Sequence, residues 1–170
     1  MHIILIGMPG CGKSTVGRAL AAARELPFTD LDVEIERAAG RTIAGIFAAE
    51  GEEYFRERET EALGRACSLE SRVIAAGGGI VLRSVNMALA KEFGVVVYLG
   101  RSCDTIQDTA DLSGRPLLAA RPERLAELFS VRRPLYEKYA DIRVQNEGSV
   151  EDAAERIWEG YSEILGHKRP

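Results

Sequence analysis

The segment that most constrains the fold is a glycine-rich stretch close to the start of the sequence. It reads Gly-Met-Pro-Gly-Cys-Gly-Lys-Ser over residues 7–14 and fills every fixed position of the phosphate-binding pattern G-x-x-x-x-G-K-[ST]. An apolar run over residues 3–6 precedes it, and a helix-like stretch over residues 15–24 follows it. This context disfavours the alternative of a glycine-rich turn without a ligand. The sequence therefore predicts a strand, a loop and a helix that together bind a nucleoside triphosphate.

Each part of this stretch has a chemical reason. The glycines let successive backbone N–H groups turn inward toward phosphate oxygens, and the helix that follows adds the positive end of its dipole. Lys13 can reach the β- and γ-phosphates, and the hydroxyl of Ser14 can join the coordination shell of Mg²⁺. The predicted nucleotide-binding residues of the loop are Gly10, Cys11, Gly12, Lys13, Ser14 and Thr15.

Charge and composition narrow the class of function. The net charge of the 170 residues is −4 and basic residues do not run together, so nothing favours a nucleic-acid partner or a membrane surface. No apolar run approaches the length that crosses a bilayer. The three cysteines lie far apart, as expected of a reducing compartment, and lack the spacing of metal ligands. We expect one domain over residues 1–170, a cytoplasmic location and a monomer.

Apolar runs recur along the chain with helical stretches between them. They cover residues 3–6, 73–76, 95–99 and 142–144, with a shorter run at 27–29. This alternation predicts an α/β fold in which a parallel sheet is covered on both faces. The carboxyl ends of parallel strands lie at one edge, where ligands bind. The phosphate loop and residues 30–32 and 77–79 each follow a predicted strand, so we expect them to meet there.

Two insertions interrupt the alternation. Residues 31–70 hold more helix than one crossover needs, with helical stretches at 33–39, 43–49 and 52–67. Residues 110–122 contain two prolines, a glycine and no clear period, which predicts a loop. A long loop beside a phosphate site is a candidate lid, because phosphoryl transfer must be shielded from water. A helical insertion and a lid around a phosphate loop are typical of a small-molecule kinase.

Two carboxylates stand where the predicted strand at 27–29 ends. Asp30 could hold Mg²⁺ through a water molecule, and Asp32 could accept a hydrogen bond from a substrate hydroxyl and take its proton. Alternatively, one of them caps the helix that begins at Val33, a role that Asp fills well. We favour the functional interpretation for both residues.

Arg56 and the glycines at 77–79 are further candidates. Glu59 follows Arg56 by three residues in a helical stretch and could fix its guanidinium for a substrate carboxylate. Local sequence alone favours the alternative, a solvated surface pair of little energetic value. The three glycines suit a ligand that approaches the backbone closely, and a flexible turn is an equal alternative.

Three later arginines complete the candidates. Arg115 lies in the predicted lid and could stabilise charge on a transferring phosphoryl group when the lid closes. Arg132 or Arg133 could bind a substrate carboxylate, and either could instead be a solvated helix charge. Nothing in the local sequence decides between them.

Taken together, these segments resemble the shikimate kinase family. The chain contains, in the order and spacing of that family, GMPGCGKST, FTDLDVEIE, GRTIAGIF, GEEYFRERE, GGGIV, GRPLL and RRPLY. The resemblance implies a P-loop, nucleoside-monophosphate-kinase-like fold with a central five-stranded parallel sheet. It places a helical substrate-binding insertion at about residues 31–60 and a lid at about 110–122. It also implies transfer of the γ-phosphoryl group of ATP to the 3-hydroxyl of shikimate, with Mg²⁺ as cofactor, in aromatic amino-acid biosynthesis.

The resemblance assigns the acceptor site residue by residue. Asp32 resembles the residue that holds the substrate hydroxyls, where it can act as the base, and Asp30 resembles the one that reaches Mg²⁺ through water. Arg56, Arg132 and the backbone of Gly78 resemble the contacts to shikimate. The resemblance therefore reverses the local interpretation of Arg56 as a surface residue.

The nucleotide side follows the family in one segment and departs from it in another. Arg115 resembles the lid arginine that touches the ATP phosphates, so the expected catalytic residues are Lys13, Asp32 and Arg115. Family members often carry basic residues just ahead of the lid, where one stacks on adenine. Here residues 104–111 include three aspartates and no arginine. An adenine-stacking arginine is therefore not expected in this stretch.

Two other functions fit parts of the pattern. A kinase of the same fold could act on gluconate or a nucleoside monophosphate, but the aspartates and two arginines suit a polyhydroxylated carboxylate better than a flat base. A nucleotide-binding regulator without catalysis is favoured only by the acidic stretch, since no candidate catalytic position is substituted. We therefore expect ATP and shikimate as the ligands of this chain.

Overall fold

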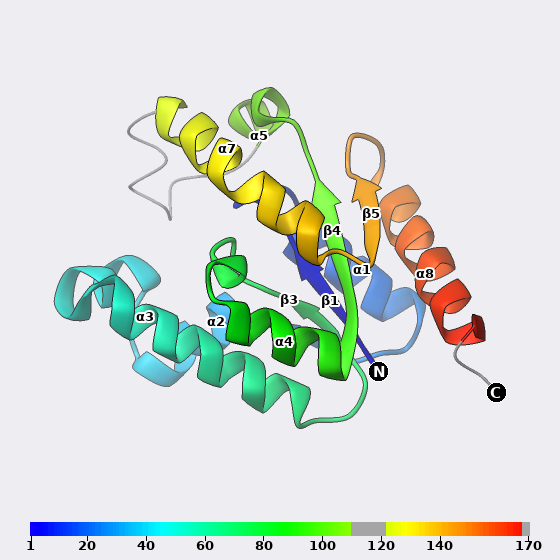
Figure 1. Cartoon of the computed structure of the whole chain (residues 1–170), viewed down its shortest axis with the longest axis horizontal. Helices are drawn as coiled ribbons and strands as arrows, with labels where there is room; N and C mark the ends of the chain where they lie inside the picture. The colour runs from blue at the N-terminus through cyan, green and yellow to red at the C-terminus, as the bar shows by residue number, and fades with distance from the viewer. Residues whose placement is uncertain (110–121, 168–170) are drawn as a thin grey trace.

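The computed structural model describes residues 1–109 and 122–167 (Figure 1). Its helices and strands alternate along the chain. In chain order they are β1 (His2–Ile6), α1 (Lys13–Ala23), β2 (Phe28–Asp30), α2 (Leu31–Ala39), α3 (Ile43–Cys67), β3 (Val73–Ala75), the short 3-10 helix η1 (Ile80–Leu82), α4 (Ser84–Phe93), β4 (Gly94–Gly100), α5 (Cys103–Thr109), α7 (Pro122–Tyr139), β5 (Ile142–Gln145) and α8 (Val150–His167).

The five strands form one parallel sheet in the order β2-β3-β1-β4-β5. In the central strand β1, Ile4 lies opposite Ile74 of β3 and Val96 of β4. Every residue of β1 and of β4 is buried, which explains their nearly continuous apolar sequences. The predicted strands are confirmed, each to within one residue at either end.

Helices cover both faces of this sheet and give the molecule three layers. In Figure 1, α4 and α7 cross the face nearer to the viewer, whereas α1 lies on the far face and packs against α8. α3 lies alongside α4, at the side of the sheet where β2 and β3 are found. The predicted three-layer α/β architecture is confirmed.

The insertion after β2 consists of α2 and the first part of α3. α3 is kinked at Gly51, whose φ of 83° and ψ of 177° lie outside the helical region and in one that glycine tolerates. The two helices predicted at 43–49 and 52–67 are therefore joined in one kinked element. α2 begins two residues earlier than predicted, because Asp30 rather than a later residue caps it.

Two further predictions concern membrane-spanning helices and the lid. No helix within residues 1–109 or 122–167 has the length and apolar character needed to cross a membrane. The predicted lid at 110–122 lies, apart from Pro122, outside the described residues, and so does Arg115.

Candidate active site

The phosphate loop follows β1 and ends where α1 begins at Lys13. Lys13 is buried, and its Nζ donates to the carbonyl oxygens of Gly7 at 2.9 Å and Met8 at 2.8 Å. The ammonium group therefore lies within the curl of the loop, where phosphate oxygens would replace these two carbonyls. A second contact holds the loop from outside, because Nδ2 of Asn146 donates to the carbonyl of Cys11 at 2.8 Å.

Ser14 and Asp30 join the start of α1 to the end of β2. Oγ of Ser14 donates to Oδ2 of Asp30 at 2.5 Å, and the other carboxylate oxygen accepts the backbone N–H of Asp32 at 3.1 Å. Asp30 thus caps α2 and faces the phosphate loop with the same carboxylate. The interpretation of Asp30 as a helix cap and its interpretation as a magnesium-binding residue therefore do not exclude each other. A hydroxyl and a carboxylate oxygen so close together are ligands of the kind that Mg²⁺ prefers.

The glycine turn after β3 packs tightly against protein groups on two sides. A Cβ built on Gly77 would lie 2.5 Å from Oε1 of Glu59 and 2.8 Å from Oδ1 of Asp32. A Cβ built on Gly78 would lie 2.7 Å from Cδ of Pro9 in the phosphate loop. Any side chain at these positions would therefore displace a neighbour. The predicted meeting of the phosphate loop, the aspartates and the glycines at one edge is confirmed.

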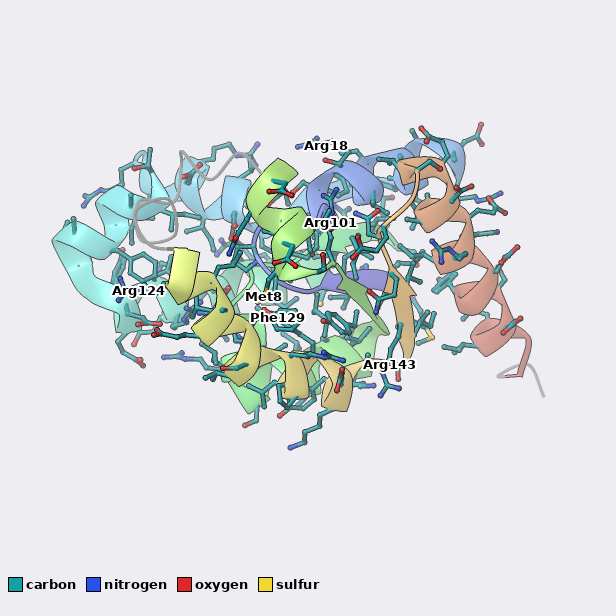
Figure 2. The ribbon with its side chains drawn as sticks, turned by 90° about the horizontal axis from the view of Figure 1, so that it is seen from above. Met8, Arg18, Arg101, Arg124, Phe129 and Arg143 are labelled. Atoms are coloured by element: carbon teal, nitrogen blue, oxygen red, sulfur yellow. The ribbon has the colours of Figure 1, made fainter. Side chains whose placement is uncertain are left out.

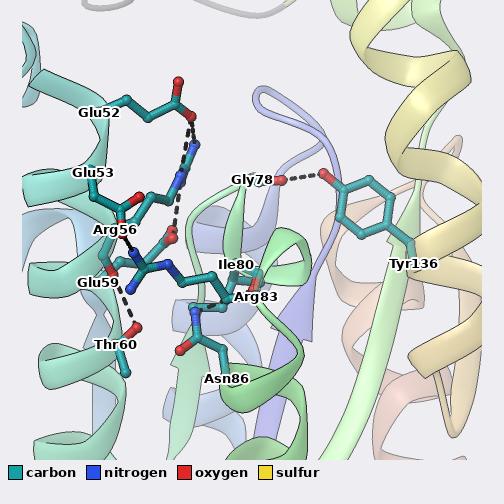
Figure 3. A network of polar contacts seen from close by, with 10 residues as sticks. All are labelled: Glu52, Glu53, Arg56, Glu59, Thr60, Gly78, Ile80, Arg83, Asn86 and Tyr136. Atoms are coloured by element: carbon teal, nitrogen blue, oxygen red, sulfur yellow. Dashed lines mark hydrogen bonds and ion pairs between the residues drawn. The ribbon is translucent and has the colours of Figure 1, made fainter.

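Arg56 lies on α3 and points toward this turn (Figure 3). One guanidinium nitrogen donates to Oε2 of Glu59 at 2.9 Å, and another donates to Oε1 of Glu52 at 3.0 Å. Arg56 is only 8% exposed and Glu59 has no exposed surface. The prediction of a solvated surface pair, made from local sequence, is therefore wrong. The pair is desolvated, which holds the guanidinium in one orientation.

The electrostatics of this pair reflect its burial. Burial raises the pKa of Glu59, while the nearby Arg56 guanidinium acts in the opposite direction. Burial alone would lower the pKa of Arg56, but Glu59 and Glu52 together raise it. Within the described part of the chain, Oε1 of Glu59 has no hydrogen-bond partner, and it faces Gly77. The site therefore holds the guanidinium of Arg56 in a fixed position, beside a carboxylate oxygen of Glu59 that can accept a hydrogen bond.

α7 supplies the opposite wall of the site. Tyr136 is fully buried, and its hydroxyl donates to the carbonyl of Gly78 at 2.5 Å (Figure 3). Arg132, one turn earlier, is half-buried, and burial raises the pKa of both Glu59 and Tyr136 while the nearby charge of Arg132 partly opposes the rise. Arg133 is exposed and pairs with Glu137 at 2.7 Å. Of the two arginines, Arg132 is therefore the one that faces the site.

A second polar cluster lies where β4 and β5 end. The backbone N–H of Asn146 donates to the carbonyl of Gly100 at 2.8 Å. The Glu147 carboxylate accepts the backbone N–H of Ser102 at 2.8 Å and the hydroxyl of Thr105 at 3.0 Å, so it ties this loop to α5. Figure 2 looks onto this edge of the sheet, with Met8 of the phosphate loop near the centre and Arg101 between α5 and α1.

Sequence reasoning assigned no individual role to Asn146, Glu147 or Tyr136. Asn146 and Glu147 directly follow a strand, at the edge where the other site residues lie, and that position was the available signal. For Tyr136 the available signal was its place in the segment RRPLY, but its partner, 58 residues away, does not follow from the local sequence.

Comparisons with known proteins agree with this geometry. The sequence profile described as shikimate kinase matches residues 9–161. A shikimate kinase of Symbiobacterium thermophilum is 43% identical over an alignment of 169 positions, which covers 96% of this chain and 97% of that protein. The structure of a shikimate kinase from Acinetobacter baumannii in complex with shikimate has a TM-score of 0.89 and 39% identity, covering 99% of this chain and 95% of that one.

The gluconate alternative has support at the level of fold alone. A gluconokinase from Sinorhizobium meliloti covers 99% of this chain, but with a TM-score of 0.56 and 14% identity. The matches to shikimate kinases are much closer in sequence and extend over nearly the whole chain. The chain therefore belongs to the shikimate kinase family, whose members are ATP-dependent kinases.

Proposed function

We propose that the residues at this edge of the sheet carry out the shikimate kinase reaction, in which the γ-phosphoryl group of ATP passes to the 3-hydroxyl of shikimate, by positioning and electrostatics. Such a transfer needs little covalent chemistry from the protein. The observation that carries this proposal is the buried guanidinium of Arg56, held by Glu59 beside Asp32 and the glycine turn. A fixed cation next to a carboxylate suits an acceptor that is both an acid and a polyol.

On the acceptor side, two arginines from different helices would bind the substrate carboxylate. Arg56 reaches it from α3, and Arg132 reaches it from α7. The backbone of Gly78 contributes a further contact from between them. Asp32, on the first turn of α2, accepts a hydrogen bond from the reacting hydroxyl and orients it toward the phosphate loop.

On the nucleotide side, the N–H groups of the phosphate loop bind the β- and γ-phosphates together with Lys13. Lys13 exchanges its bonds to Gly7 and Met8 for bonds to phosphate oxygens. Arg115, which lies outside the described residues, would add positive charge at the transferred group.

Mg²⁺ fits the residues that face the phosphate loop. Ser14 would ligate it directly and Asp30 through a water molecule, since the two side chains meet at 2.5 Å. Magnesium is usually bound by one or two protein oxygens together with substrate phosphates and waters, so this small ligand set is sufficient. When bound, Mg²⁺ neutralises negative charge that develops on the phosphates.

The organisation of the chain is part of the proposal. Residues 1–170 would act as one kinase domain, with the substrate-binding insertion at about 31–60 and the lid at about 110–122. We propose that it works as a monomer in the cytoplasm. We also propose that it has no nucleic-acid or membrane partner, because a net charge of −4 does not attract polyanions. Sedimentation of the purified protein tests the monomer.

The test of the reaction is ADP release by purified protein with Mg²⁺-ATP and shikimate, gluconate, AMP or no acceptor. We expect turnover that requires shikimate and is lost when EDTA removes Mg²⁺. Turnover with gluconate or AMP in place of shikimate would overturn the carboxylate-binding role of the two arginines. ATP binding without turnover on any acceptor would favour the nucleotide-binding regulator.

A further inference from the structure

Tyr136 makes a contact that the proposed roles leave unexplained. It is the bulkiest of the fully buried side chains among the described residues, and its hydroxyl lies 2.5 Å from the carbonyl oxygen of Gly78. A buried phenol without a partner would be costly, so this hydrogen bond helps to make a tyrosine acceptable here. In Figure 3 the bond bridges the gap between α7 and the glycine turn.

The ring of Tyr136 is held from the side of the sheet. It stacks on Tyr98 of β4, with ring centroids 5.3 Å apart and an interplanar angle of 21°. The hydroxyl also lies 3.9 Å from the sulfur of Met8 in the phosphate loop. Both neighbours belong to the rigid centre of the fold, because β4 pairs directly with β1, and the phosphate loop follows β1.

The glycine turn is confined between Tyr136 and the phosphate loop. A Cβ at Gly78 would lie 2.7 Å from Cδ and 2.8 Å from Cγ of Pro9, so the backbone of Gly78 packs closely against the proline ring. Tyr136 therefore holds the turn from one side while Pro9 limits it on another. The position of the acceptor turn relative to the phosphate donor depends on both contacts.

The hydrogen bond also fixes the orientation of one peptide group. A trans peptide is planar, and its C=O and N–H point in opposite directions. The described part of the chain has no cis peptide bond, so the N–H of Gly79 points away from Tyr136 when the carbonyl of Gly78 points toward it. Figure 3 shows Arg56 on the far side of the turn from Tyr136. The N–H of Gly79 is thereby directed to the side on which the carboxylate-binding arginine lies.

We infer that Tyr136 is a positioning residue for phosphoryl transfer: its hydrogen bond to Gly78 aims the glycine turn at the acceptor and sets its distance from the phosphate loop. The inference rests on the proposed acceptor site. Arg132 and Tyr136 are four residues apart on α7, so the same bond also fixes the helix face that presents Arg132.

The test compares two tyrosines that make the same kind of bond. In Tyr136→Phe the hydroxyl is lost and the ring remains. The matched control is Tyr161→Phe, because the Tyr161 hydroxyl also donates to a backbone carbonyl, that of Met1 at 2.7 Å, in a part of the fold remote from the site. Both variants should show a fall in melting temperature, since each loses a hydrogen bond from a buried tyrosine to a backbone carbonyl.

The kinetic readouts separate positioning from stability. We expect Tyr136→Phe to lower kcat/KM for shikimate about tenfold, as loss of one well-made hydrogen bond implies, with ATP affinity within about twofold of the original. Tyr161→Phe should leave both constants unchanged. If Tyr136→Phe loses stability without a change in kcat/KM, Tyr136 is only a core residue and the inference is overturned.

Two further replacements keep the test valid if Tyr136→Phe folds poorly. Replacing Tyr136 with 4-fluorophenylalanine fills the space of the hydroxyl without a donor, and 4-aminophenylalanine restores a donor. We expect the first to show the kinetic defect and the second to relieve it; an equal defect in both would overturn the inference. Shikimate-dependent turnover by the unmodified protein, measured alongside, reports separately on the proposed function.

Discussion

The guanidinium of Arg56 and the carboxylate of Glu59 form a 2.9 Å ion pair with almost no contact with solvent. An Arg56→Ala substitution should raise the KM for shikimate about 100-fold, because losing a desolvated, hydrogen-bonded charge contact to the substrate carboxylate costs about 3 kcal/mol of binding. The dissociation constant of ATP should change less than about twofold, since Arg56 lies on the acceptor side. Steady-state kinetics and nucleotide titration measure the two effects.

The control for this experiment is Arg58→Ala on the same helix. Arg58 pairs with Glu61 at 2.8 Å with the same three-residue spacing, but the two side chains are 37% and 46% exposed, in contrast to the buried pair. We expect no change in the KM for shikimate and only a small loss of stability. A collapse of ATP affinity in Arg56→Ala, with an unchanged shikimate KM, would show that the assignment of Arg56 is wrong.

Asp30 has two separable roles, and two substitutions divide them. Asp30→Asn keeps a side-chain oxygen that can cap α2 but removes the charge facing Ser14, so stability should stay close to the original. The Mg²⁺ concentration for half-maximal activity should rise about tenfold, since the negative charge of the Asp30 carboxylate beside the metal is lost. Asp30→Ala should show the same shift and also lose about 1 kcal/mol of stability.

Thr42→Ala is the matched control for the capping role. The Thr42 hydroxyl caps α3 by accepting the backbone N–H of Gly45 at 3.1 Å. Its loss should lower the melting temperature about as much as Asp30→Ala does and leave the Mg²⁺ requirement unchanged. An unaltered Mg²⁺ requirement in Asp30→Asn would contradict a metal role for Asp30.

Two glycine-to-alanine substitutions should change stability in opposite directions. At Gly77 the new methyl group would lie 2.5 Å from the Glu59 carboxylate and 2.8 Å from that of Asp32, so we expect a loss of about 1–3 kcal/mol from overpacking and a strong fall in kcat. At Gly64, inside α3, the nearest atom would be 4.0 Å away. Gly64→Ala should therefore raise the free energy of unfolding by about 0.5–1 kcal/mol, because alanine favours the helix. Urea unfolding of both variants tests this, and a stable, active Gly77→Ala protein would show that the turn is less tightly packed.

The imidazole of His2 should make stability depend on pH. His2 is buried, with Nε2 3.1 Å from the carbonyl of Cys67, and burial lowers its pKa below the ordinary 6.5. The unfolded chain then binds a proton at this site at a higher pH than the folded chain does. The stabilising contribution of neutral His2 to the free energy of unfolding is therefore complete above pH 6.5. It is lost as the pH falls toward the pKa of His2 in the folded protein.

The chain has two histidines, so proton NMR can follow each one. We expect one imidazole resonance to titrate below pH 6.5 and to disappear in His2→Gln, in which the acid-side loss of stability should also be smaller. A normal or raised pKa for His2 would contradict this prediction.

The sequence predicted those parts of the fold that depend on local patterns. The phosphate loop, the strands and the position of the aspartates after β2 follow from spacing within a few residues. The kink in α3 was expected as a break between two helical stretches, and it falls at Gly51 between them. Convergence at one sheet edge follows from parallel topology, so it was predictable as well.

The environment of the side chains was less predictable. Whether Arg56 is solvated depends on α3 packing beside the glycine turn, which lies about 20 residues later in the chain. The choice between Arg132 and Arg133 depends on the rotation of α7, which the bond from Tyr136 to Gly78 fixes across 58 residues. Glu147 and Ser102, which are 45 residues apart, meet because the paired strands β4 and β5 end side by side. Only the resemblance to a family supplied such long-range information in advance.

The two bonds from Lys13 to its own loop have a consequence for calorimetry. Because the ammonium group already donates to Gly7 and Met8, nucleotide binding exchanges one set of acceptors for another and does not satisfy an unpaired cation. The heat released on binding is then a difference between two favourable states. A modest binding enthalpy for ATP would therefore be no sign that Lys13 fails to engage the phosphates.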